Sequence, residues 1–172
     1  MEVSQSTENL RSQGYHILRS VFPDPTIERF RALTIMNLDI MGRTREAEHS
    51  RHLAGFHRFP ALATLHSEIA SNRKIYDTLS DYYEGRAYYA IGLSDITVNR
   101  SQQWHTDLLR GKYSEFLKDG SPWVETRGSC IKALVYLQAG NSLRVLPRFH
   151  LSPTPLDDPM LDSIARLSLI HI

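Results

Sequence analysis

The chain changes character at Gly85, and no other feature of the sequence constrains its fold as strongly. Before Gly85, apolar residues recur at helical spacing in residues 22–42 and 61–84. After it come short runs rich in Val, Ile and Tyr, separated by Gly, Ser, Asn and Pro: RAYYAIGL, DITVNR, SCIKALVYLQ and SLRVLP. Helices followed by strands predict an α+β protein whose second half is an antiparallel sheet or barrel.

The N-terminal segments give more detailed expectations. A short polar helix is expected to break at Gly14 and to continue as a strand-like run over residues 15–18. The next helix should begin after Asp24, a plausible N-cap that precedes Pro25, and should end at Gly42.

Residues 43–60 carry His49, His52 and His57 among many charged residues. A loop or frayed helix that lines an entrance is one interpretation, and an ordinary solvated surface is the other. Residues 61–85 are expected to form one or two helices that end at the glycine.

Length and composition exclude several classes of protein. A chain of 172 residues suits one domain, and its 20 basic and 19 acidic residues are mixed along the sequence, which argues against nucleic-acid and membrane partners. The single cysteine, Cys130, excludes a disulfide framework and suits a reducing cytoplasm. No signal-peptide pattern begins the chain, and no apolar run approaches the roughly 20 residues that cross a bilayer, so a cytoplasmic protein is expected.

The stretch SQQWHTDLLRG holds the residues with the clearest chemical meaning. In a strand, His105 and Asp107 point to the same face while Thr106 points away, so both side chains can reach one ion. An imidazole and a carboxylate are two ligands of the facial triad that holds non-haem Fe(II), although zinc or manganese would also accept them. His66 and Glu68 share this spacing, but they lie in a helical pattern where residues two apart diverge.

In order along the chain, the segments ENLRSQGYHILRSVFPDPTIERFRAL, QQWHTDLLRG, CIKALVYLQ and NSLRVLPRFHLSP resemble the phytanoyl-CoA dioxygenase family. These are oxygenases that depend on Fe(II) and 2-oxoglutarate. The resemblance covers residues 1–166 and implies a double-stranded β-helix, a jelly-roll or cupin-like barrel, after the N-terminal helices. It also implies that His105 and Asp107 bind the iron and that the enzyme uses O2 to hydroxylate a small organic substrate.

The family also has a distal histidine ligand and an arginine that binds 2-oxoglutarate, and neither is clearly present here. Pro147 to His150 departs from the small residues usual at the family's turn, and His150 is expected to pack or cap. His171 is the other downstream candidate, but residues 167–172, LSLIHI, match a translated sequencing adapter and are expected to be a non-native tail that adds nothing to the fold. A barrel that is incomplete at its C-terminus, and an inactive fragment, are therefore expected.

Three readings of function remain open at this point. The first is the oxygenase, in which Lys132 could pair with a carboxylate of 2-oxoglutarate or could instead extend from the outer face of the barrel. The second is a non-catalytic binding or structural barrel without a complete metal site. The third is a cupin-type enzyme that uses another divalent ion, which the N-terminal segment disfavours.

Overall fold

A computed structural model of the chain describes residues 4–43, 48–87, 94–100, 131–140, 143–151 and 170–171. The chain divides into two compact units, although its length alone favours one domain. One unit comprises Met1–Leu10 and His16–Ser101, and the other comprises Arg11–Tyr15 and Gln102–Ile172. The described residues form a mixed structure of helices and short antiparallel strands, as the α+β prediction requires. Within those ranges, no helix is both long and apolar enough to cross a membrane.

The first long helix, α2 (Asp24–Met36), begins one residue earlier than the sequence predicts. Its N-cap is Pro23, in extended conformation, whose carbonyl accepts hydrogen bonds from the backbone of Thr26 and Ile27. The helix also ends before Gly42, because the Asn37 side chain donates a hydrogen bond of 2.8 Å to the Leu33 carbonyl and the chain turns into η1 (Leu38–Ile40). The predicted C-terminal boundary was therefore wrong by about a turn and a half.

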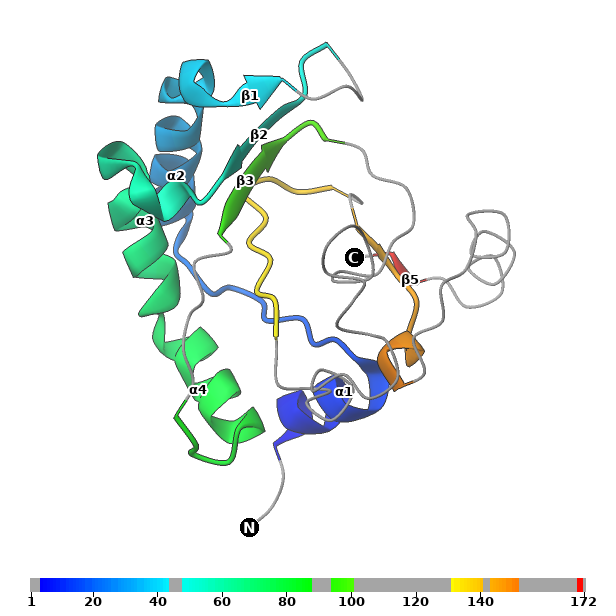
Figure 1. The fold of residues 1–172 in the computed structure, drawn as a ribbon. Helices are drawn as coiled ribbons and strands as arrows, with labels where there is room; N and C mark the ends of the chain where they lie inside the picture. The colour runs from blue at the N-terminus through cyan, green and yellow to red at the C-terminus, as the bar shows by residue number, and fades with distance from the viewer. Residues whose placement is uncertain are drawn as a thin grey trace, which may run out of the picture. The chain divides into compact units, whose positions relative to one another are not determined.

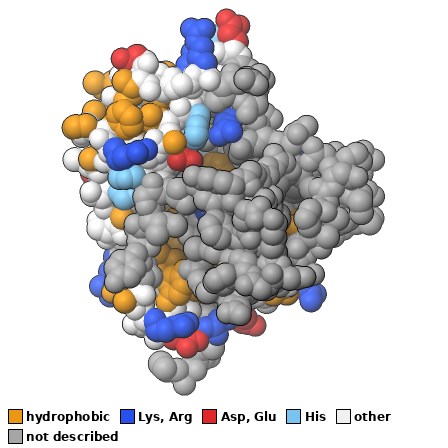
Figure 2. All heavy atoms as spheres, viewed as in Figure 1, with side chains coloured by type: hydrophobic (Ala, Val, Ile, Leu, Met, Phe, Trp, Pro, Cys, Tyr) orange, Lys and Arg blue, Asp and Glu red, His pale blue; other side chains and the backbone are white. Residues whose placement is uncertain are grey.

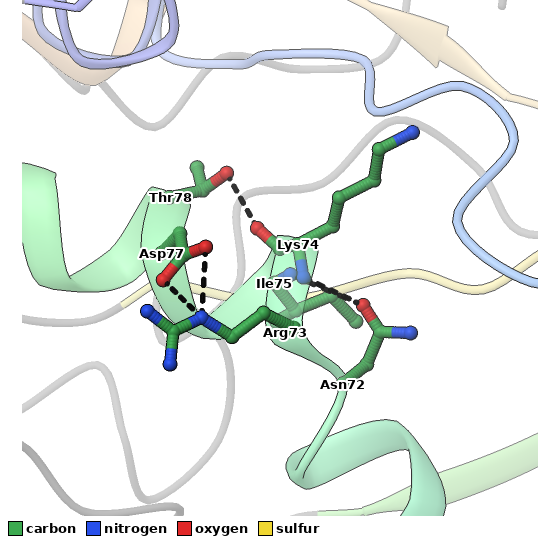
Figure 3. A network of polar contacts seen from close by, with 6 residues as sticks. All are labelled: Asn72, Arg73, Lys74, Ile75, Asp77 and Thr78. Carbon is green, nitrogen blue, oxygen red and sulfur yellow. Dashed lines mark hydrogen bonds and ion pairs between the residues drawn. The ribbon is translucent and has the colours of Figure 1, made fainter.

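Two further helices, α3 (Pro60–Ala70) and α4 (Arg73–Tyr82), occupy the segment that the sequence assigns to one or two helices. Asn72 separates them, and its side-chain oxygen accepts hydrogen bonds from the first backbone amides of α4, as Figure 3 shows for Lys74. This is the usual way to satisfy the free amides at a helix start. The segment ends at Gly85, as predicted, with φ of 72° and a hydrogen bond from its amide to the Ser80 carbonyl.

A small antiparallel sheet has the strand order β1-β2-β3, formed by β1 (Gly42–Arg43), β2 (Arg51–Ala54) and β3 (Asp95–Val98). The third strand lies in DITVNR, as predicted. The second lies in residues 43–60, where the sequence predicts a loop or frayed helix, so strands also precede α3 and α4 (Figure 1). The prediction was wrong because β2 is only four residues long and its sequence, RHLA, does not alternate polar and apolar residues, while its partner β3 is distant in the sequence.

The core of the first unit lies where α2 and α3 pack beside one another. Phe30 and Leu62 are fully buried, and Leu65, Leu53 and Phe56 are nearly so. Among the residues that the structure describes, Met41 and Ile75 are also buried. Leu53 and Phe56 come from β2 and the short helix η2 (Phe56–Arg58), so the sheet and helices share one apolar layer.

In the second unit, β4 (Arg144–Val145) pairs antiparallel with β5 (Ile170–His171). The strand predicted in SLRVLP is therefore present, but residues 131–138 of the predicted SCIKALVYLQ strand are assigned to no strand. The structure also differs from the expectation that residues 167–172 add nothing to the fold, because the backbone of Ile170 and His171 is paired. A double-stranded β-helix is not seen in the described parts of the chain.

Gly14 ends helix α1 (Gln5–Gln13), as predicted, and the residues that follow it form no strand. Its φ is 86°, and a Cβ at this position would clash with Nδ1 of the His150 ring. His150 belongs to η4 (Phe149–Leu151), and its Nε2 lies 3.1 Å from the Arg11 carbonyl oxygen. The backbone amide of Arg148 donates to the Gln13 carbonyl at 2.8 Å. These contacts tie the end of α1 to the turn around His150.

Gly14→Ala should lower the free energy of unfolding by more than the roughly 1–2 kcal/mol that a left-handed backbone costs a residue with a side chain. The excess comes from the contact with His150. Urea unfolding followed by circular dichroism measures it, with Gly85→Ala as the matched control, because that glycine has a similar φ and nothing within 4 Å of the added Cβ. Equal losses in the two variants would contradict the close approach of His150 to Gly14.

Candidate functional site

The sequence-predicted iron ligands, His105 and Asp107, lie outside the described residues, so their convergence stays a prediction. Lys132 lies inside them and has an exposed side chain on a segment without strand pairing. Its predicted place beside the iron ligands is not tested, because those ligands are not described. His150 caps the end of α1, which agrees with the packing or capping role expected for it. His171 has its backbone paired with Arg144.

A group of histidines gathers in the first unit, on three different elements. We call His52, His57, His66, Ser94 and Asp95 the histidine cluster. The first lies on β2, the second on η2 and the third on α3, while the serine and aspartate lie at the start of β3. Figure 2 shows histidine side chains at the surface beside basic, acidic and hydrophobic side chains.

The reversal of the chain at Gly55 brings these residues together. Gly55 has φ of 66°, a left-handed conformation that glycine adopts without strain, and it turns the chain from β2 into η2. Its amide donates to Oδ1 of Asp95 at 3.4 Å, and the amide of Phe56 donates to the Ser94 carbonyl at 3.1 Å. The turn after β2 is therefore bonded to the beginning of β3.

Two interactions join the histidines to each other and to the serine. Nδ1 of His57 lies 2.6 Å from Oγ of Ser94, a short hydrogen-bond distance. The rings of His57 and His66 have their centroids 5.2 Å apart and are tilted by 46°. Phe56 also contacts the His66 ring edge-on, at 5.6 Å between centroids. His66 thus lies against an apolar ring and a second imidazole, both from η2.

This environment lowers the pKa of His66. Burial is the larger cause, because it disfavours the charged imidazolium, and the neighbouring His57 adds repulsion when both rings are protonated. The lowered pKa favours the neutral form of His66 at pH 7, in which the ring has one nitrogen that donates and one that accepts.

The carboxylate of the cluster is directed to a different histidine. Asp95 Oδ2 lies 3.4 Å from Nε2 of His52, while its Oδ1 accepts from the Gly55 amide. His57 is bonded to Ser94, and no carboxylate of a described residue bonds its other nitrogen, as a Ser-His-Asp relay would need. Among the residues that the structure describes, no three His, Cys, Asp or Glu side chains converge as metal ligands. The described cluster therefore lacks the geometry of that nucleophilic relay.

The expectation that His66 and Glu68 do not act as a pair is confirmed. On α3 the two side chains diverge: His66 contacts His57, whereas Glu68 forms an ion pair with Arg29 of α2. The hydrogen bond from Arg29 holds the pKa of Glu68 below its usual range. The sequence did not reveal that His57 and His66 are partners, because their contact depends on how η2 packs against α3.

Comparisons with protein-family models, with curated proteins and with solved structures find no match to this chain. The likeness to phytanoyl-CoA dioxygenases therefore rests on the sequence motifs alone.

Lowering the pH should destabilise the protein through His66. The unfolded chain binds a proton at this residue near pH 6.5, whereas the folded state binds it only at lower pH. The stability associated with neutral His66 is therefore present above about pH 6.5 and is lost as the pH falls through the folded pKa. NMR titration of the His66 ring measures this pKa directly.

Replacing His57 should shift that titration upward. In His57→Gln the like charge is gone but the burial remains, so the pKa of His66 should rise part of the way to its ordinary value. His49→Gln removes a histidine outside the cluster and should leave the curve unchanged. A His66 that titrates above about pH 6.5 in the native protein would contradict the described environment.

Proposed function

We propose that this chain carries the iron-binding region of an oxygenase that depends on Fe(II) and 2-oxoglutarate and resembles phytanoyl-CoA dioxygenases. The observation that carries the proposal is the His105-Thr106-Asp107 stretch within the ordered set of segments that resembles the family. The small organic substrate is hydroxylated in a barrel of the double-stranded β-helix type, which we propose for the second half of the chain.

The described elements support the order of segments on which this proposal depends. Helix α1 ends at Gly14, a stretch without helix or strand follows, and α2 begins after Pro23. Near the other end, β4 leads into the turn that contains Arg148 and η4. The family resemblance implies a strand after the glycine, then a helix and, later, a strand that leads into a turn; the described residues match this order except for the strand after Gly14.

The donor set suits the metal. One neutral imidazole and one carboxylate, spaced for the same face of a strand, are two of the three protein ligands that Fe(II) takes in such enzymes. When bound, the iron couples oxidative decarboxylation of 2-oxoglutarate, which gives succinate and CO2, to hydroxylation of a C–H bond by O2. His105 and Asp107 would hold the ion, and Lys132 would pair with a carboxylate of 2-oxoglutarate.

Iron and 2-oxoglutarate should bind together, and this binding should depend on the proposed ligands. Anaerobic titration of Fe(II) and 2-oxoglutarate should produce the weak visible charge-transfer band of such complexes, and His105→Ala or Asp107→Asn should abolish it. Lys132→Met should weaken 2-oxoglutarate binding about tenfold or more, because a carboxylate of the cosubstrate would lose its cationic partner.

His66→Gln and Glu68→Gln are matched controls for this titration, because the two residues have the same spacing as the proposed ligands but diverge on α3. Both variants should retain the band. Loss of the band in all four variants would point to general unfolding, which circular dichroism would reveal. A folded native chain without the band would favour the non-catalytic binding barrel.

The chain of 172 residues should release no succinate above background with Fe(II), 2-oxoglutarate and ascorbate. Two of the three iron ligands are assigned, and no arginine is assigned to the far carboxylate, a contact that would be bidentate and strong. Succinate release is measured beside the His171→Ala variant. Release by the native chain that this variant abolishes would show that His171 completes the site and that its assignment to a non-native tail is wrong.

A further inference from the structure

A cavity of about 410 Å³ opens beside the sheet of the first unit, and its lining includes no residue of the histidine cluster. Its lining combines basic and apolar side chains with one carboxylate. The lining residues are Leu38, Asp39, Met41, Arg43, His49, Arg51, Val98 and Asn99. They come from η1, from β1 and β2, from the residues before β2 and from the end of β3.

The two arginines face this cavity from adjacent strands. Arg43 of β1 lies directly opposite Arg51 of β2 in the antiparallel register, so both side chains are on the same face of the sheet. Val98 of β3 lies opposite Arg51 on its other side and continues the same face. Like charges placed opposite each other destabilise a strand pair, unless an anion lies between them.

Both arginines have guanidinium N–H groups that remain available to bind a ligand. One terminal nitrogen of Arg51 donates to the carbonyls of Glu48 and Ser50, at 2.9 Å each, which orients the guanidinium without neutralising it. The Arg43 side chain makes no hydrogen bond or ion pair with any described residue. Asp39 lines the same cavity but lies beyond ion-pair distance of both arginines.

The apolar residues of the lining indicate what else the ligand must contain besides its charged group. Leu38, Val98 and the almost fully buried Met41 supply an apolar wall next to the charged one. A fully hydrated inorganic ion would leave this wall without a partner, whereas a short alkyl chain would cover it. A guanidinium fork matches a carboxylate with two parallel hydrogen bonds.

From this combination we propose that the cavity binds a small carboxylic acid with a short alkyl chain. Arg43 and Arg51 would bind its carboxylate, and the apolar wall would contact its alkyl chain. The site lies on the helix-packed face of the sheet, the face to which the buried Leu53 also belongs. His52 and Asp95 lie on the opposite face, so the cavity is independent of the histidine cluster.

The test uses hexanoate as the probe and follows the backbone amide signals of Gly42, Val98 and Asn99 by NMR at constant ionic strength, without iron or 2-oxoglutarate. Hexanoate should shift these signals saturably and should bind more tightly than acetate or inorganic phosphate. Arg43→Gln should weaken hexanoate binding about tenfold or more. Asp39→Asn should strengthen it, because a competing negative charge is removed.

Two controls separate this site from other effects. Arg31→Gln removes the same charge from the exposed surface of α2, where Arg31 pairs with Glu28, and should leave the affinity unchanged. His105→Ala should also bind hexanoate normally, so failure of the oxygenase proposal and failure of this one are distinguishable. Arg43→Gln should not lower the unfolding midpoint, since it relieves a like-charge pair.

The proposal would be overturned by any of three results: no saturable shift with hexanoate, equal weakening in Arg43→Gln and Arg31→Gln, or phosphate binding as tight as hexanoate binding.

Discussion

The first unit depends on the pairing of β2 with strands on both of its sides. Two of its four residues pair with β1 from the segment just before it, and all four pair with β3, about forty residues further along the chain. Leu53 anchors the strand in the apolar layer of α2 and α3. Because side chains alternate along a strand, this single buried residue decides which of its neighbours face the helices and which face away.

This alternation places the basic cavity and the pair of His52 with Asp95 on opposite faces of the sheet. Arg51 shares the face of Leu53 and lines the basic cavity, whereas His52 points the other way and pairs with Asp95. The left-handed turn at Gly55 then places His57 against Ser94 and His66. A slip of one residue in the pairing of β2 would exchange the two faces, so the cavity and the histidine cluster depend on the same register.

The proposed oxygenase function and the structural findings concern different residues. His105 and Asp107 form a chemically specific donor pair in the sequence, and their assignment depends on that spacing and on the segments around it. The histidine cluster shows, by contrast, how closely spaced titratable groups can be positioned without forming a metal site: Asp95 pairs with His52, while His57 binds Ser94. Counting histidines and carboxylates therefore does not identify a site, because the direction of each side chain decides what it can bind.

The sequence by itself determined the features that depend on local chemistry. Gly14 ends α1 with a positive φ, Pro25 lies in the first turn of α2, and the spacing of His66 and Glu68 on a helix correctly predicts that they diverge. Only the tertiary structure decided that Arg51–Ala54 is a strand and that the backbone of His171 pairs with Arg144. It also decided that residues 131–138 form no strand, although their sequence is rich in residues that favour strands. The physical reason is that strand pairing satisfies backbone hydrogen bonds between segments far apart in the chain, and no short stretch of sequence carries the identity of its distant partner.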